Sequence, residues 1–130
     1  MTKKIVATPA APSAIGPYNQ AVIHNGVVYC SGQIAIDPET SELVENDVTL
    51  QSERVMKNLE AVLREAGTSF DHALKCTCYL ATMDDFAAFN EVYGRYFSPD
   101  TAPARATVSA AGLPKNVLVE VDCVAALPDA

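Results

Sequence analysis

The dipeptide Asn25-Gly26 is the strongest local structural signal in the chain. It separates two strand-like runs, residues 20–24 and 27–31, by only two residues. Asn-Gly readily adopts the positive φ angles of a type I′ turn, and this turn matches the twist of the strands that it joins. The sequence therefore predicts a tight β-hairpin, which commits the fold to an antiparallel strand pair.

A long amphipathic segment follows the turn-like residues 37–40. Apolar side chains recur there at helical spacing, at Val55, Leu59, Val62, Leu63 and Ala66. Asp47 is a suitable N-cap, and Gly67 stands where a left-handed C-terminal cap belongs. These boundaries predict a helix of about 19 residues, roughly 28 Å long.

The second half of the chain predicts a strand, a helix and two more strands. Residues 74–81 have strand propensity, and Asp84 or Asp85 is expected to open the helix. The apolar stripe of this helix comprises Phe86, Phe89, Tyr93 and Tyr96. Strands at 106–110 and 117–125 are expected to form a closing hairpin. Because strands and helices do not alternate regularly, we expect an α+β fold with both helices on one face of a mixed sheet.

The predicted last strand carries apolar side chains on both faces. One face holds Val117, Val119, Val121 and Cys123, and the other holds Leu118, Glu120, Asp122 and Val124. Two helices on one side of the sheet leave its other face without a cover. Large exposed apolar surfaces usually mark interfaces, so we expect a homo-oligomer.

Length and charge narrow the possible functions. The 130 residues suit one domain, residues 1–130. The net charge is −7 without a dense basic cluster, which is not the electrostatic pattern of a nucleic-acid binder. The apolar runs are too short to cross a bilayer, so no membrane partner is expected. No signal-peptide pattern follows Lys3 and Lys4, and a cytoplasmic location is expected.

The four cysteines allow two interpretations. Cys76 and Cys78 share one face of a strand, and His72 lies four positions before Cys76, which permits a metal-site interpretation. However, the sequence has no second Cys/His cluster to complete a tetrahedral site. We therefore favour buried free thiols and expect no metal.

Two charged residues stand alone in apolar, strand-like sequence near the C-terminus. Arg105 lies within residues 103–108, and Glu120 lies within residues 117–122. An unpaired buried charge costs several kcal/mol, so each residue is either solvated or held in a cleft. The residues alone leave two interpretations open: a structural ion pair, or an anion-binding cation beside a proton-transfer carboxylate.

Motifs along the chain resemble the Rid family, the reactive-intermediate (enamine/imine) deaminases. They are Gly16-Pro17-Tyr18-Asn19-Gln20-Ala21, Ser31-Gly32-Gln33, Ala66-Gly67, Phe89-Asn90-Glu91-Val92-Tyr93, Pro103-Ala104-Arg105-Ala106-Thr107-Val108, Leu113-Pro114-Lys115 and Val119-Glu120-Val121. They cover nearly the whole chain in the family's order and spacing. The resemblance implies a chorismate-mutase-like fold (ββαβαββ). It also implies a homotrimer whose sheets form a central barrel, with ligand clefts between the subunits.

The same resemblance implies a reaction without a metal or organic cofactor. Members similar to this chain hydrolyse 2-imino acids, such as 2-iminobutanoate and 2-iminopropanoate, to 2-keto acids and ammonia. A guanidinium can donate two parallel hydrogen bonds to the substrate carboxylate, which suits Arg105. Glu120 matches the family's acidic position, where it would activate water and return a proton to the departing nitrogen.

The resemblance also places five further residues near the cleft. The Tyr18 hydroxyl would bond the substrate or the water, and Gly32 would admit a close approach of the ligand. Thr107 stands where many members have Cys or Ser. A thiol therefore has no role at this position, but the main chain of Thr107 can still contact the ligand. Phe89 and Asn90 lie near the family's cleft, although the stripe that contains Phe89 is also the expected core face of its helix.

A second class of function uses the same residues. A non-catalytic binding module that senses 2-keto or other small carboxylic acids, or contacts client proteins, would also need Arg105. Only Glu120 separates this alternative from a deaminase, because only the enzyme needs a proton-transfer group. A nuclease or translation-inhibitor role, attached to some relatives, is disfavoured by the acidic charge balance.

Overall fold

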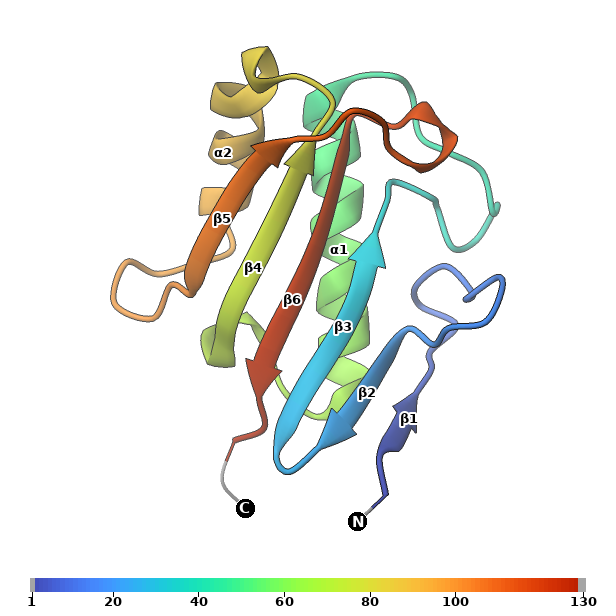
Figure 1. Cartoon of the computed structure of the whole chain (residues 1–130), viewed down its shortest axis with the longest axis vertical. Helices are drawn as coiled ribbons and strands as arrows, with labels where there is room; N and C mark the ends of the chain where they lie inside the picture. The colour runs from blue at the N-terminus through green and yellow to red at the C-terminus, as the bar shows by residue number, and fades with distance from the viewer. Residues whose placement is uncertain (1, 129–130) are drawn as a thin grey trace.

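The computed structural model describes residues 2–128, and within them six strands form one sheet in the order β1-β2-β3-β6-β4-β5. The elements are β1 Lys4–Val6, β2 Ala21–His24, β3 Val27–Gln33, α1 Val48–Ala66, β4 Ala73–Leu80, α2 Phe86–Gly94, β5 Ala104–Ser109 and β6 Val119–Ala126. Figure 1 shows both helices behind the sheet. The predicted α+β fold, with two helices on one face of a mixed sheet, is confirmed.

The predicted N-terminal hairpin is present. Asn25 and Gly26 have φ angles of 51° and 77°, and the antiparallel register of β2 and β3 runs from Ala21↔Cys30 to His24↔Val27. The sequence did not predict β1, which pairs antiparallel with β2. Three residues are too few to show a period, and β1 forms because β2 offers it an open edge.

Helix α1 begins and ends where its capping residues predict. Oδ1 of Asp47 accepts a hydrogen bond from the backbone N–H of Leu50 at 2.9 Å. Gly67 has a φ of 94°, and the N–H of Thr68 donates to the carbonyl of Leu63 at 2.9 Å, which closes the C-terminal turn. The helix spans 19 residues. Its fully buried apolar stripe comprises Val55, Met56, Leu59, Val62 and Leu63.

The second helix is shorter than its aromatic stripe. Helix α2 follows Asp85, as predicted, but ends at Gly94, so Tyr96 lies beyond it. Tyr96 still packs edge-to-face on Phe70, with ring centroids 5.5 Å apart. Both helices therefore close over the same core.

The expected C-terminal hairpin is wrong. Strand β5 pairs in parallel with β4, whereas β6 lies between β3 and β4 and is antiparallel to both. Helix α2 carries the chain back over the sheet, and this crossover makes β5 parallel to β4. The apolar residues on both faces of β6 suit its central position.

The two faces of the sheet differ in exposure. The side chains of β6 that face the helices are fully buried, namely Val119, Val121, Cys123 and Ala125. The opposite, open face carries large apolar side chains that are 45–50% exposed, namely Ile5, Tyr29, Leu74 and Val108. The predicted apolar second face is therefore present. In the described part of the chain, no helix has the length and apolarity needed to traverse a membrane.

We expect Leu59→Ala to lower the free energy of unfolding by about 2–5 kcal/mol, because it leaves a cavity between α1 and the sheet. Leu50→Ala is the matched control, since Leu50 lies on the same helix but is 42% exposed. Its cost should stay within about 0.5 kcal/mol. Urea denaturation at one fixed protein concentration measures both, and equal losses would contradict this placement of the core.

Candidate active site

Arg105 extends from edge strand β5 on the side of the helices. It pairs in register with the buried Cys76, so both side chains leave the same face of the sheet. Its Nη1 donates to Oδ1 of Asn90 at 2.6 Å. Its Cζ lies 4.8 Å from the ring centroid of Tyr93 and 5.5 Å from that of Phe86. One neutral acceptor and two aromatic rings therefore hold the guanidinium.

No carboxylate among residues 2–128 neutralises Arg105. Within residues 2–128, the one ion pair closer than 4.0 Å joins Arg95 to Glu53, at 3.2 Å. A guanidinium has five N–H donors, and the contact with Asn90 uses one of them. The remaining donors are available to an anion, which is the role that the family resemblance implies for this residue.

Glu120 extends from β6 on the open face, where it pairs in register with Tyr79. Its half-buried carboxylate lies against Gly32, and a Cβ at position 32 would overlap it. The absence of a side chain at Gly32 is thus what makes room for Glu120. Burial, and then the neighbouring charge of Asp122, raise the pKa of Glu120 above its usual value. A carboxyl group whose pKa is raised in this way holds a proton more readily, which suits it to proton transfer.

A cavity of about 310 Å³ opens beside Gly32. Its lining includes Tyr18, the apolar side chains of Ile15, Ile34 and Ile36, and Lys115. The buried Gln20 fixes the loop that carries Tyr18, because its Nε2 donates to the carbonyls of Pro12 at 2.7 Å and Thr8 at 3.1 Å. The loop is therefore a tethered wall of the cavity.

The predicted site residues form two groups on opposite faces of the sheet. Arg105 and Asn90 lie together on the helix side, whereas Tyr18, Gly32 and Glu120 lie together on the open side. A direct ion pair between Arg105 and Glu120 within one chain is excluded by this arrangement. We call these two groups, one with Arg105 and one with Glu120, the half-sites of the candidate site.

Two of the predicted site residues are placed in ways that the sequence did not reveal. Phe89 is fully buried, with its ring centroid 5.6 Å from that of Tyr93, so it supports the site from the core and does not line a cleft in this chain. Thr107 lies on the same face as Arg105, and its Oγ1 is buried without a hydrogen-bond partner among the described residues. Its strand, β5, is an edge of the sheet, which leaves main-chain groups on its outer side without a strand partner.

Sequence reasoning missed Tyr93 and Gln20 as supports of the site. The sequence predicts Tyr93 as part of the core stripe of α2. In the structure, the guanidinium of Arg105 also lies over the ring of Tyr93. A buried polar residue at the start of a strand, as at Gln20, signals a tethered loop, and such a signal is visible in the sequence.

The four cysteines are buried free thiols, as predicted. Cys30, Cys123 and Cys76 occupy matching register positions across β3, β6 and β4. Burial raises the pKa of Cys30 and of Cys78 to about 12. Among the described residues no group of His, Cys, Asp and Glu is arranged to hold a metal ion.

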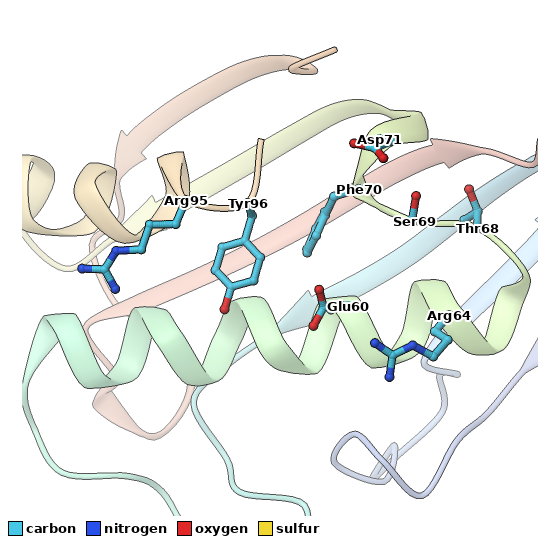
Figure 2. A pocket seen from close by; sticks show the side chains of 8 residues that line it. All are labelled: Glu60, Arg64, Thr68, Ser69, Phe70, Asp71, Arg95 and Tyr96. Atoms are coloured by element: carbon cyan, nitrogen blue, oxygen red, sulfur yellow. The ribbon is translucent and has the colours of Figure 1, made fainter. Parts of the chain in front are cut away.

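A second hollow lies away from both half-sites, between α1, residues 68–71 and the end of α2 (Figure 2). It measures about 320 Å³ and is lined by Glu60, Arg64, Thr68, Ser69, Phe70, Asp71, Arg95 and Tyr96. The close-up shows the Tyr96 hydroxyl pointing toward α1. None of the predicted site residues lines this hollow, and its Arg95 is already paired with Glu53.

Comparisons with known proteins agree on one family. The family model described as Endoribonuclease L-PSP matches residues 8–127. A RutC family protein of Synechocystis is 52% identical over 98% of this chain and 99% of its own length. The mouse protein named 2-iminobutanoate/2-iminopropanoate deaminase is 41% identical, over 95% of this chain and 90% of its own.

Solved structures give the same result. A Rid-family protein from Yersinia pestis superposes with a TM-score of 0.94 at 44% identity, covering 97% of this chain and all of the other. E. coli TdcF, solved with bound serine, superposes with a TM-score of 0.90 at 38% identity, covering 96% and 99%.

The fold and the two half-sites thus describe a small α+β protein with an available guanidinium on one face of its sheet and a half-buried carboxyl group on the other. The family model and the solved relatives show that the chain belongs to the Rid family. The names L-PSP and RutC, which the family model and the Synechocystis relative carry, refer to the same family.

We expect Asp122→Asn to lower the pKa of Glu120, because it removes the negative charge that opposes ionisation of that carboxyl group. The pKa should remain above the usual value, since burial is its larger cause. Carbon-detected NMR titration of the Glu120 carboxyl group measures the shift. The exposed Asp71→Asn is the control, and an unchanged or higher midpoint in Asp122→Asn would contradict this electrostatic account.

Proposed function

We propose that the chain is a hydrolytic deaminase of reactive 2-imino acids, such as 2-iminobutanoate and 2-iminopropanoate, which protects pyridoxal-phosphate enzymes from these products. The observation that carries the proposal is the guanidinium of Arg105, held by Asn90 and Tyr93 and not neutralised by any described carboxylate. A fixed, available cation is what a 2-imino acid needs for its carboxylate. The name of the mouse relative supports the same reaction.

The complete site is proposed to form between the subunits of a homotrimer. Arg105 and Glu120 leave opposite faces of the sheet, so one chain cannot direct both at one small substrate. The open face also carries exposed apolar side chains that association would bury. If the open faces pack around a central barrel, Arg105 of one subunit can complete the half-site that holds Gly32 and Glu120 of its neighbour.

The proposed chemistry follows from the two half-sites. Arg105 binds the substrate carboxylate and so fixes the C=N carbon next to the Glu120 carboxylate. Glu120 takes a proton from a water molecule as the water oxygen attacks that carbon, which gives a tetrahedral carbinolamine. Glu120 returns this proton to the nitrogen, and it then carries the hydroxyl proton of the carbinolamine to the same nitrogen as the C–N bond breaks and the C=O bond forms. Ammonia leaves with the electron pair of the C–N bond, and the keto acid remains. Proton transfer of this kind typically contributes about 10²–10⁴-fold to the rate.

A non-catalytic carboxylate-binding module is the second candidate. It is favoured by the serine bound to E. coli TdcF, because that complex shows a relative with a small carboxylate ligand. Both functions use Arg105, so Glu120 is the residue that separates them. An endoribonuclease, as in the description of the family model, is opposed by the net charge of −7.

The four cysteines are buried free thiols, and thiols stay reduced in a reducing compartment. We infer a cytoplasmic location from them.

The deaminase is tested by adding the protein to a threonine dehydratase reaction with semicarbazide as the imine trap. The proposal predicts that the trapped fraction falls and that keto-acid release speeds up as protein is added. Glu120→Gln should reduce this effect by at least about 10²-fold while 2-oxobutanoate still binds. A trapped fraction that excess wild-type protein leaves unchanged would reject the enzyme and favour the binding module.

Gly32→Ala tests the role of the glycine. The added Cβ would occupy the place of the Glu120 carboxylate and turn it away from the substrate. We expect a large loss of turnover in the same assay with little loss of thermal stability, because the displaced group is the end of a flexible side chain. Gly112→Ala is the control, since nothing lies within 4 Å of a Cβ there. Full activity in Gly32→Ala would contradict the placement of Glu120.

A further inference from the structure

Lys115 occupies a conformation that is unusual for a lysine. Its φ is 55°, and the following Asn116 has a φ of 56°, so two successive residues other than glycine adopt the left-handed region. Such conformations are unfavourable, persist only when the surrounding structure holds them, and concentrate at ligand sites.

The turn around Lys115 is held from both sides. The N–H of Asn116 donates to the carbonyl of Leu113 at 3.0 Å, and the N–H of Val117 donates to that of Pro114 at 3.2 Å. The N–H of Leu118 donates at 2.9 Å to Oε1 of Gln51, a buried residue of α1. The backbone that carries Lys115 is thus fixed to the core, and the lysine projects from a rigid base.

Lys115 lines the cavity of about 310 Å³ that also contains Tyr18 and Gly32. Among the described residues that line this cavity it is the one charged side chain. No described carboxylate lies within 4.0 Å of its ammonium group. Its positive charge is available to a ligand.

The cavity is larger than the simplest substrates require. The side chain of 2-iminopropanoate is a single methyl group, whereas the cavity has apolar walls from Ile15, Ile34 and Ile36. Methylene groups would contact these walls, and an ammonium on the same lining would meet a negative charge at the end of the ligand side chain.

We propose that Lys115 determines specificity by binding the terminal carboxylate of dicarboxylic 2-imino acids, the class derived from aspartate and glutamate. The proposal rests on the proposed function in one respect: the first carboxylate binds Arg105 of a neighbouring subunit. The terminal carboxylate then extends past Gly32 into the cavity. The two carboxylates of the ligand thus bind two separate cations, Arg105 of the neighbouring subunit and Lys115.

Calorimetric binding of two keto-acid products tests this role directly. 2-Oxoglutarate and 2-oxopentanoate have five carbons each and differ in the terminal carboxylate. We expect wild type to bind 2-oxoglutarate more tightly. Lys115→Gln should weaken that binding by about tenfold, as expected for loss of one charge-assisted hydrogen bond, and change 2-oxopentanoate binding by less than about twofold. Lys115→Arg should keep the preference, and added salt should reduce it.

Lys57→Gln is the matched control, because Lys57 is an exposed lysine of α1 that lines a different hollow. It should leave both affinities unchanged. Failure of wild type to prefer 2-oxoglutarate, or an equal loss of both ligands in Lys115→Gln, would overturn the proposal. Failure of the proposed deaminase function would give a different result: wild-type protein would bind keto acids but would not hydrolyse 2-iminobutanoate.

Discussion

Side chains alternate between the two faces of the sheet along β6, and this alternation determines where the charged residues of the candidate site can lie. This central strand sends Val119, Val121 and Cys123 into the core beneath the helices, where they are fully buried. The intervening Glu120 and Asp122 must then face the open side of the sheet, because successive side chains of a strand leave opposite faces. Packing of the core therefore fixes which face carries the acid. Arg105 lies in register with the buried Cys76, so the same alternation assigns it to the other face.

Because of this separation, neither half-site of the candidate site contains both the guanidinium and the carboxyl group. The helix side binds Arg105 through Asn90 and two aromatic rings, which orient a cation without neutralising it. The open side places Glu120 over Gly32, where burial and Asp122 disfavour its ionised form. Both arrangements cost free energy. Arg105 has no described carboxylate as a partner, and the ionised form of Glu120 is destabilised. Such costs persist where a ligand offsets them, and association of subunits is the arrangement that would let one ligand reach both.

Local chemistry made much of the fold predictable. The positive φ angles of Asn25-Gly26 set the hairpin, and the caps at Asp47 and Gly67 set both ends of α1. The pairing of β5 and β6 was not predictable in the same way, because strand partners far apart in sequence are chosen by tertiary packing. The division of the site had the same cause: Arg105 and Glu120 were recognisable as candidates, but only the pairing of both strands with β4 shows that their side chains leave opposite faces of the sheet. The core position of Phe89 likewise depends on which face of α2 packs against the sheet.

We propose that Arg105 of one subunit acts with Glu120 of its neighbour, and mixing the subunits of two inactive variants distinguishes this arrangement from a site within one chain. Arg105→Ala and Glu120→Gln are each expected to be inactive alone, since each removes one half of every site. Co-expressed in equal amounts, they should form mixed oligomers in which about a quarter of the sites pair an intact Arg105 with an intact Glu120, if assembly is random. Recovery of about a quarter of wild-type deaminase activity is the predicted result. Mixed oligomers that stay inactive would contradict the account and place both residues' work within a single chain.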